Sequence, residues 1–130
     1  MISRLFGPVV DMDDNGRIVI DCRGVGYDVV VHDRDRLTLN ARRGTEQLVF
    51  VRTVVKEPPE GQVLYGFLDA DDRRMFDRII AVKGCGPAVA MKLLSVAPPS
   101  SVENAITNGG TFNVRGVGPK TWATLREAWS

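Results

Sequence analysis

Two short stretches of the 130-residue chain share one pattern that suggests a common chemistry. Residues 83–87 read KGCGP and residues 115–119 read RGVGP: a cation, a glycine, an apolar residue, a second glycine and a proline. Glycines one residue apart permit a tight turn, and the proline after them favours the start of a helix. Such a turn exposes backbone N–H groups beside the positive end of a helix, which together form a site for an anion such as phosphate.

The surroundings of both turns supply positive charge. From Arg78 to Arg126 the chain has six cations and one acid, Glu103, although its overall net charge is only +1. Such turns contact the nucleic-acid backbone without reading bases, and the cations make the binding salt-dependent. Two phosphate sites on one domain can hold both strands of a duplex. The predicted DNA-binding residues are Lys83, Gly84, Cys85, Gly86, Ala88, Lys92, Arg115, Gly116, Val117, Gly118, Lys120 and Thr121.

The second turn also raises the question of catalysis. Residues 116–121, GVGPKT, resemble the hairpin of certain DNA glycosylases, in which the lysine at the position of Lys120 is a nucleophile. Those enzymes also need a carboxylate downstream of the hairpin, and Glu127 is the only acid that follows. We therefore do not expect glycosylase chemistry, and no nucleotide-binding P-loop is present either.

The remaining chemistry-bearing residues indicate no metal, cofactor or catalytic site. Cys22 and Cys85 lie far apart and outside any metal-ligand spacing, and the only histidine, His32, adjoins Asp33 in a charged run. Reduced, buried thiols are typical of a cytoplasmic protein. No apolar stretch is long enough for a transmembrane helix. The sequence thus predicts a cytoplasmic binding protein without catalytic residues or cofactors.

The sequence predicts strands in the first half of the chain and helices, which carry the glycine turns, in the second half. The first half of the chain carries five short apolar runs separated by turn residues, at 2–10, 18–20, 27–31, 48–55 and 63–67. Five short strands in this length predict a small closed barrel such as an OB-fold, with a five-stranded SH3-like barrel as the alternative. We expect this barrel domain to span residues 1–68.

The second half has helical periodicity. Asp69 or Asp71 is expected to cap a helix that Gly84 ends, and Pro87 opens the next. Residues 100–103, SSVE, form a capping-box sequence for a third helix that 108–110 stop, and Pro119 opens the last. The aromatic residues of that last helix are assigned to packing. The predicted fold class is α+β, an all-β barrel followed at 69–130 by a tandem helix-hairpin-helix domain.

With these elements in place, the whole chain resembles the RuvA family of bacterial proteins that bind Holliday junctions. The matching segments are MISRL at 1–5, GVGYDV at 24–29, VVKE at 54–57, LYGF at 64–67, GCGP at 84–87, LLS at 93–95 and GVGPKT at 116–121. The resemblance implies an OB-fold at the centre of a homotetramer, alone or in pairs, which holds an open four-way junction with one duplex arm per subunit. It also implies a partner, the ATP-driven RuvB motor, and a role in branch migration during recombination and repair.

The resemblance assigns a further role to the loop between the fourth and fifth predicted strands. In the family this loop carries an acidic pin, whose charge repels phosphates at the crossover and keeps the strands apart. Glu57 matches one pin carboxylate, Pro58 replaces the usual second acid, and Glu60 can supply the second charge.

The chain departs from the family pattern at several positions. Ala88 stands where the family often has lysine, Arg115 replaces a proline, and the connector 108–114 is a few residues short. If one hairpin binds more weakly, these differences favour the second as the weaker one. The family's third, motor-binding domain has no counterpart in these 130 residues, which are either a piece of a longer chain or a natural short relative. Only in a natural short relative is motor recruitment by the usual route not expected.

The hairpins are also compatible with other functions. A general duplex-DNA-binding module, or a relative that coats junctions without a motor, would carry the same hairpins. A non-catalytic subunit that grips DNA for a repair nuclease would carry them as well.

Overall fold

The computed structural model describes residues 1–110 and 112–129. The chain divides into two compact units, Met1–Arg73 and Arg74–Ser130, which are described separately below. The domain boundary between residues 68 and 69 stays a prediction. None of the helices in the described ranges combines the length and the hydropathy needed to cross a lipid bilayer.

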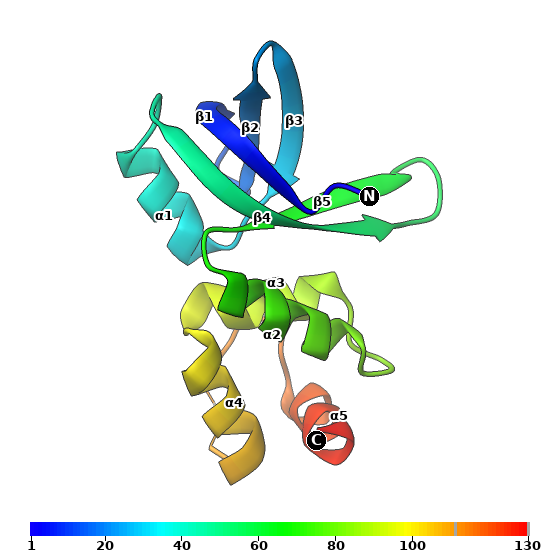
Figure 1. Cartoon of the computed structure of the whole chain (residues 1–130). Helices are drawn as coiled ribbons and strands as arrows, with labels where there is room; N and C mark the ends of the chain where they lie inside the picture. The colour runs from blue at the N-terminus through cyan, green and yellow to red at the C-terminus, as the bar shows by residue number, and fades with distance from the viewer. Residues whose placement is uncertain (111, 130) are drawn as a thin grey trace. The chain divides into compact units, whose positions relative to one another are not determined.

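The first unit is a closed barrel of five strands in the order β1-β2-β3-β5-β4 (Figure 1). The strands are β1 (Arg4–Met12), β2 (Arg17–Cys22), β3 (Val25–Val30), β4 (Glu46–Val55) and β5 (Gln62–Phe67). All neighbours pair antiparallel except β3 and β5, which are parallel. A helix, α1 (Asp33–Ala41), connects β3 to β4. This five-stranded arrangement is that of an OB-fold, so the predicted fold class is confirmed and the SH3-like alternative is not adopted.

Strand alternation explains the barrel core. Successive side chains of a strand point to opposite faces, so every second residue of β1 and β4 faces inward. Leu5 and Val9 of β1 and Val49 of β4 are buried with the apolar residues of β2 and β3. Phe6 and Leu48, which pair across β1 and β4, point outward and are 58% and 40% exposed.

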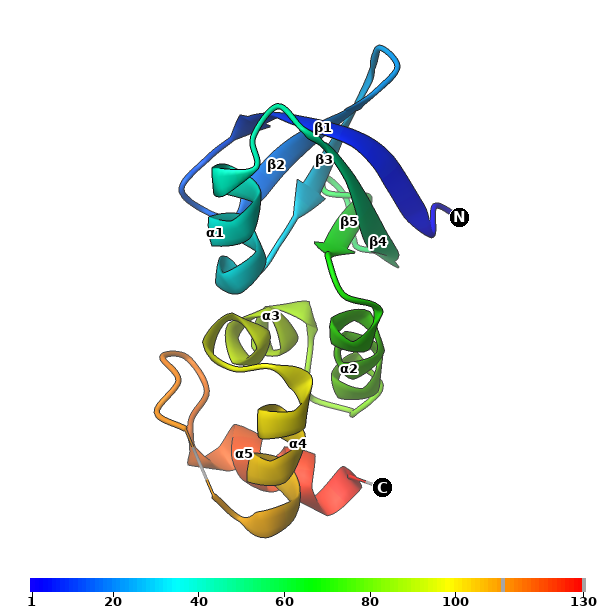
Figure 2. The ribbon, with the colours of Figure 1, turned by 60° about the vertical axis from the view of Figure 1, so that its left-hand side comes forward.

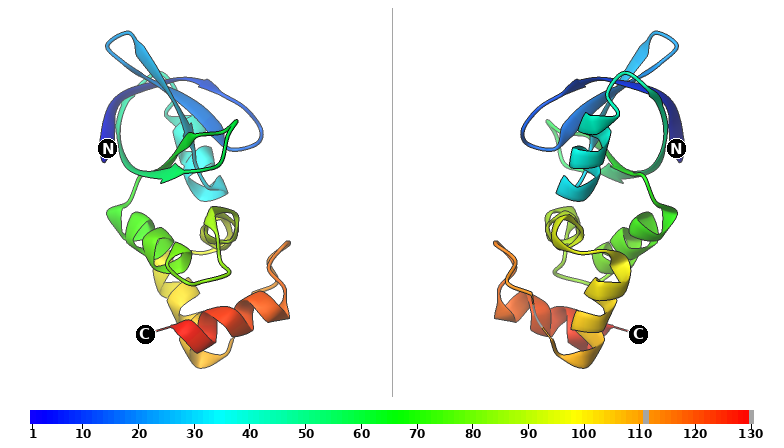
Figure 3. Two further views of the ribbon diagram at one scale, coloured as in Figure 1. Left: turned by 90° about the vertical axis from the view of Figure 1, so that its right-hand side faces the viewer. Right: turned by 90° about the vertical axis from the view of Figure 1, so that its left-hand side faces the viewer.

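The turn between β2 and β3 is tighter than predicted. Arg23 and Gly24 both have positive φ, 52° and 92°, as in the two-residue turns that suit a twisted hairpin. The Asp21 carboxylate accepts the Gly24 N–H at 2.7 Å. The third strand therefore begins at Val25 rather than at residue 27, and the turn projects beyond the ring of strands (Figure 3).

Helix α1 was missed by the sequence analysis, and its start is held by a buried polar network. His32 is the N-cap residue, and its Nδ1 accepts the Asp35 N–H at 3.3 Å. Nδ1 is therefore unprotonated in the neutral ring, and Nε2 donates to Asp72 Oδ2 at 2.8 Å. Arg34 also donates to both Asp72 oxygens, and Leu68 N–H donates to Asp35 at 3.0 Å. This network joins the start of α1 to the chain that follows β5.

The second unit is helical. Helix α2 (Ala70–Ile80) leads into it, and α3 (Pro87–Val96), α4 (Pro99–Asn108) and α5 (Pro119–Ala128) follow (Figure 2). The predicted starts of α3 and α5 at proline are confirmed, as is the end of α4, where the C-cap residue Gly109 has a φ of 74°. Buried apolar residues of the last three helices form the core of this unit, among them Leu93, Leu94, Val102, Ile106, Trp122 and Leu125.

The predicted capping box at 100–103 is wrong. Helix α4 begins earlier, at Pro99, with Pro98 as its N-cap residue and no side-chain capping bond. The proline ring fixes φ near its helical value, so Pro99 starts the helix before Ser100 can cap it.

Candidate nucleic-acid interface

The first glycine hairpin is a tight turn that ends in a helix start. Cys85 N–H donates to Val82 O at 3.0 Å, and Gly84 between them has a φ of 94°, which favours glycine. Gly86 is the extended N-cap residue of α3, and its carbonyl accepts the Ala90 N–H at 3.3 Å. The Cys85 side chain packs inward, and burial raises the pKa of its thiol, which opposes a role as a nucleophile.

The second hairpin repeats this geometry residue by residue. Val117 N–H donates to Val114 O at 3.0 Å, and Gly116 has a φ of 87°. Gly118 is the extended N-cap residue of α5, and its carbonyl accepts the Trp122 N–H at 3.2 Å. The repeated sequence is therefore a repeated structure, and the short connector before it leaves the local turn unchanged.

Both hairpins leave backbone donors available to a ligand. The first N–H groups of a helix have no intrahelical carbonyl partner, and a polar N-cap side chain usually accepts one of them. Gly86 and Gly118 have no such side chain, and neither helix has a side-chain capping bond. The N–H groups at positions 88 and 89, and at 120 and 121, are thus presented at the exposed glycine turns.

The six cations of this region fall into two groups, and the first group acts within the protein. Arg78 forms an ion pair with Glu103, and its guanidinium lies 4.1 Å from the ring centroid of Trp129. Arg126 donates to the carbonyls of Ala105 and Gly110. These two arginines therefore hold helices and the connector in place.

The second group consists of the four cations nearest the glycine turns. Lys83, Lys92, Arg115 and Lys120 are all exposed. Within residues 1–110 and 112–129, none of them forms an ion pair with a carboxylate. Their charge is therefore uncompensated by the described part of the protein, which suits an anionic partner.

Each turn also contacts the helix that follows the other turn. The position that a Cβ would take on Gly84 lies 3.8 Å from Thr124 Cγ2 on α5. The position that a Cβ would take on Gly116 lies 2.6 Å from Lys92 Nζ on α3. Gly116 follows Gly84 by 32 residues, and Thr124 follows Lys92 by the same 32, so the two contacts are equivalent.

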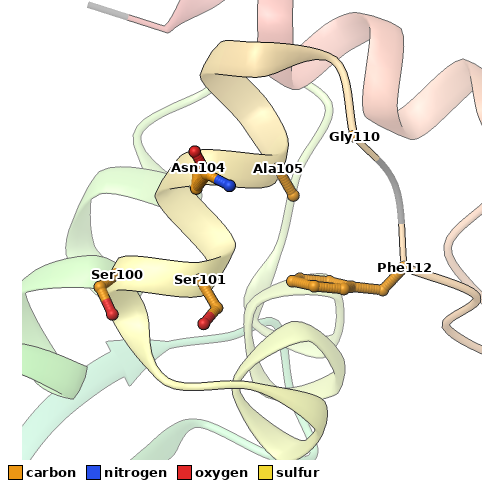
Figure 4. A pocket seen from close by; sticks show the side chains of 6 residues that line it. All are labelled: Ser100, Ser101, Asn104, Ala105, Gly110 and Phe112. Carbon is orange, nitrogen blue, oxygen red and sulfur yellow. The ribbon is translucent and has the colours of Figure 1, made fainter.

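The connector between α4 and α5 borders a surface pocket of about 320 Å³ (Figure 4). Its lining comes from Ser100, Ser101, Asn104 and Ala105 of α4, and from Gly110 and Phe112 of the connector. Phe112 also meets Trp122 edge to face, with 6.1 Å between the ring centroids. Among the described lining residues there are neutral polar groups but no general base for the serines, so they give no support to catalysis.

The predicted acidic pin lies in the first unit. The loop joins β4 to β5, whose ends pair at Val55 and Gln62, and it therefore closes a β-hairpin. Glu57 and Glu60 are both exposed on this loop. Its negative charge is thus open to solvent, and its role as a pin stays a prediction.

One group of potential metal ligands was missed by the sequence analysis. His32, Asp35 and Asp72 are buried with ligand atoms within 4.8 Å of one another. Their contacts are those of a hydrogen-bonded network, because Arg34 already binds Asp72 and the imidazole uses both nitrogens. Burial raises the pKa of the Asp35 carboxyl above its ordinary value of 3.8. His32 and Asp72 are in contact although they lie 40 residues apart in the sequence, so no local motif marked this group.

An OB-fold barrel followed by two glycine hairpins is an architecture suited to nucleic-acid binding. The model of the family described as RuvA N terminal domain matches residues 1–66, just over half of the chain, and the chain belongs to this family. The sequence-based assignment to the family is thereby confirmed.

Curated relatives extend the similarity over the helical half. A protein of Acidiphilium cryptum (strain JF-5), named Holliday junction branch migration complex subunit RuvA, is 38% identical over 128 residues, which cover 96% of this chain and 61% of the relative. Proteins of the same name from Corynebacterium glutamicum (strain R) and Legionella pneumophila (strain Corby) are 40% identical over 108 residues and 33% identical over 129. These cover 83% and 93% of this chain, and 50% and 61% of the relatives. The chain thus spans between half and about three fifths of these relatives' length.

Proposed function

We propose that this protein is a non-catalytic, structure-specific DNA-binding protein that binds four-way junctions as a homotetramer and supports branch migration in recombination and repair. The observation that carries the proposal is the repeated hairpin geometry with four uncompensated cations around it. The names of the relatives supply the substrate class, a Holliday junction.

In this proposal the hairpins bind the DNA backbone. Each turn presents helix-start N–H groups to a phosphate oxygen, with Lys83 beside the first turn and Arg115 and Lys120 beside the second. Because each site binds phosphate rather than a base edge, affinity depends on salt and little on sequence.

The barrel contributes assembly and junction preference. The outward Phe6–Leu48 pair is compatible with the proposed contact between copies, because a second copy that covered these two exposed apolar side chains would remove them from water. The exposed carboxylates of Glu57 and Glu60 repel phosphates at the crossover, as expected for a pin.

A gel-shift comparison tests the function. The protein is titrated against an immobile four-way junction and against a linear duplex built from the same sequences, at matched salt. We expect clearly tighter binding to the junction and, by light scattering, a tetramer on it. Equal affinity for both DNAs would contradict junction recognition and favour a general duplex-binding module.

A further inference from the structure

The two glycine hairpins have equal geometry but unequal charge. The first has one neighbouring cation, Lys83, since Ala88 follows its proline. The second has Arg115 before its first glycine and Lys120 after its proline. The reciprocal contacts between the hairpins add a further difference in charge. Lys92 lies at Gly116 of the second turn, whereas the neutral Thr124 lies at Gly84 of the first.

Lys92 belongs to α3 in sequence but lies at the second turn in space. Its Cδ, Cε and Nζ lie 3.2, 3.1 and 2.6 Å from the position of a Cβ on Gly116. The end of the side chain therefore covers this glycine, and the ammonium lies where the second turn meets solvent. No carboxylate within the described ranges neutralises it.

The equivalent position at the first turn is neutral. Thr124 faces Gly84, and its hydroxyl already donates to Lys120 O at 3.0 Å. A neutral side chain whose hydroxyl is engaged adds no charge to the first site.

We propose that Lys92 binds the phosphate held by the second hairpin, so that this hairpin has three cations and is the stronger of the two DNA-backbone sites. The inference rests on the proposed function. It reverses the order that the sequence favoured, in which the second hairpin was the weaker of the two. Since charge–charge attraction falls with distance, the ammonium acts mainly on the phosphate at Gly116.

The test measures duplex affinity by fluorescence anisotropy over a series of salt concentrations, using the full 130-residue chain. Lys92→Met removes the charge and keeps an apolar side chain. We expect affinity to fall by about threefold to tenfold, and the slope of log K against log salt to decrease by about one. Lys92→Arg, which keeps the charge, should retain most of the affinity.

Two combinations identify the hairpin that Lys92 serves. With Arg115→Met, which removes a cation of the second turn, the joint loss should be smaller than the product of the single losses, because both cations share one phosphate. With Lys83→Met, which acts at the first turn, the two losses should multiply. The reverse pattern would assign Lys92 to the first hairpin and overturn the inference.

Thr124→Lys is the reciprocal variant, since it places a lysine opposite Gly84. We expect it to raise affinity by about threefold to tenfold and to steepen the salt dependence by about one. Unchanged binding by Lys92→Met, with losses for Lys83→Met and Lys120→Met, would overturn the role of Lys92 and leave the proposed function intact. Unchanged binding by all of these variants would overturn DNA binding by the hairpins and this inference with it.

Discussion

The buried imidazole of His32 donates from Nε2 to the Asp72 carboxylate at 2.8 Å, and this bond joins residues 40 positions apart in the sequence. Removing either residue leaves the other polar group buried without this hydrogen-bond partner, which lowers the free energy of unfolding more than the loss of an exposed hydrogen bond does. We expect His32→Ala to lower the free energy of unfolding by about 3 kcal/mol in urea melts. Asp14→Asn, at an exposed turn of the same unit, should change it by less than about 0.5 kcal/mol.

The raised pKa of Asp35 gives a pH dependence with a definite sign. A carboxyl whose pKa is higher in the folded than in the unfolded state stabilises the fold below its ordinary value of 3.8, and this contribution is lost as pH rises through the folded value. Asp35→Asn has no such titration, and its amide oxygen can still accept the Leu68 N–H. Urea melts from pH 3.5 upward should therefore show the wild type losing stability relative to this variant. A constant difference across this range would contradict a raised pKa.

The N-cap glycines allow stability to be separated from DNA binding. Serine at positions 86 and 118 can cap α3 and α5, so Gly86→Ser with Gly118→Ser should raise stability by a few tenths of a kcal/mol. The same hydroxyls occupy the N–H groups that phosphate would use, so junction affinity should fall about tenfold or more. Gly110→Ser adds a serine outside the turns, where a Cβ meets no neighbour within 4 Å, and should leave affinity unchanged.

The division of the cations into two groups is testable with matched variants. Arg78→Met loses the Glu103 ion pair and the contact with the Trp129 ring, and should lower stability by about 1 kcal/mol with little change in DNA affinity. Lys83→Met should lower DNA affinity with little change in stability, because no acid of the described chain engages this lysine. Thermal melts and anisotropy titrations on both variants measure the two effects. A large affinity loss for Arg78→Met alone would contradict the grouping.

Charge reversal on the β4–β5 loop tests the acidic pin. Glu57→Lys with Glu60→Lys should strengthen binding to all DNA, since it removes repulsion and adds attraction, and should reduce the preference for an open junction. The control is Asp14→Lys with Glu46→Lys, which makes the same change of charge elsewhere on the barrel surface. If the control shifts the junction preference equally, the loop has no special role.

Most of the fold could be predicted because its elements carry strong local signals. Val49, Val51 and Thr53 alternate with more exposed residues along β4, and this period identifies a strand facing a core. The glycines at 84 and 116 and the prolines after them likewise specify turn and helix start within five residues. For the hairpins, local sequence was sufficient.

The features that escaped prediction depend on distant partners. Of the nine residues of α1, only Asp35 and Leu39 are buried, so the helix has no apolar stripe to reveal it. His32 looked like part of a charged surface run, because Asp72, which makes its burial possible, is far away in sequence. The place of Lys92 at Gly116 also follows from helix packing, which the spacing of residues within either hairpin does not determine.

The reciprocal contacts of Gly84 with Thr124 and of Gly116 with Lys92 have a consequence in terms of symmetry. Exchanging the two hairpins maps one contact onto the other, which is the property of a local dyad within a single chain. Duplex DNA has dyads of its own, perpendicular to its axis, that relate its antiparallel strands. A pair of hairpins with this symmetry can meet both strands through identical backbone groups and with the same polarity. If the hairpins bind DNA as proposed, the 32-residue repeat matches the protein to the symmetry of a double helix rather than to any base sequence.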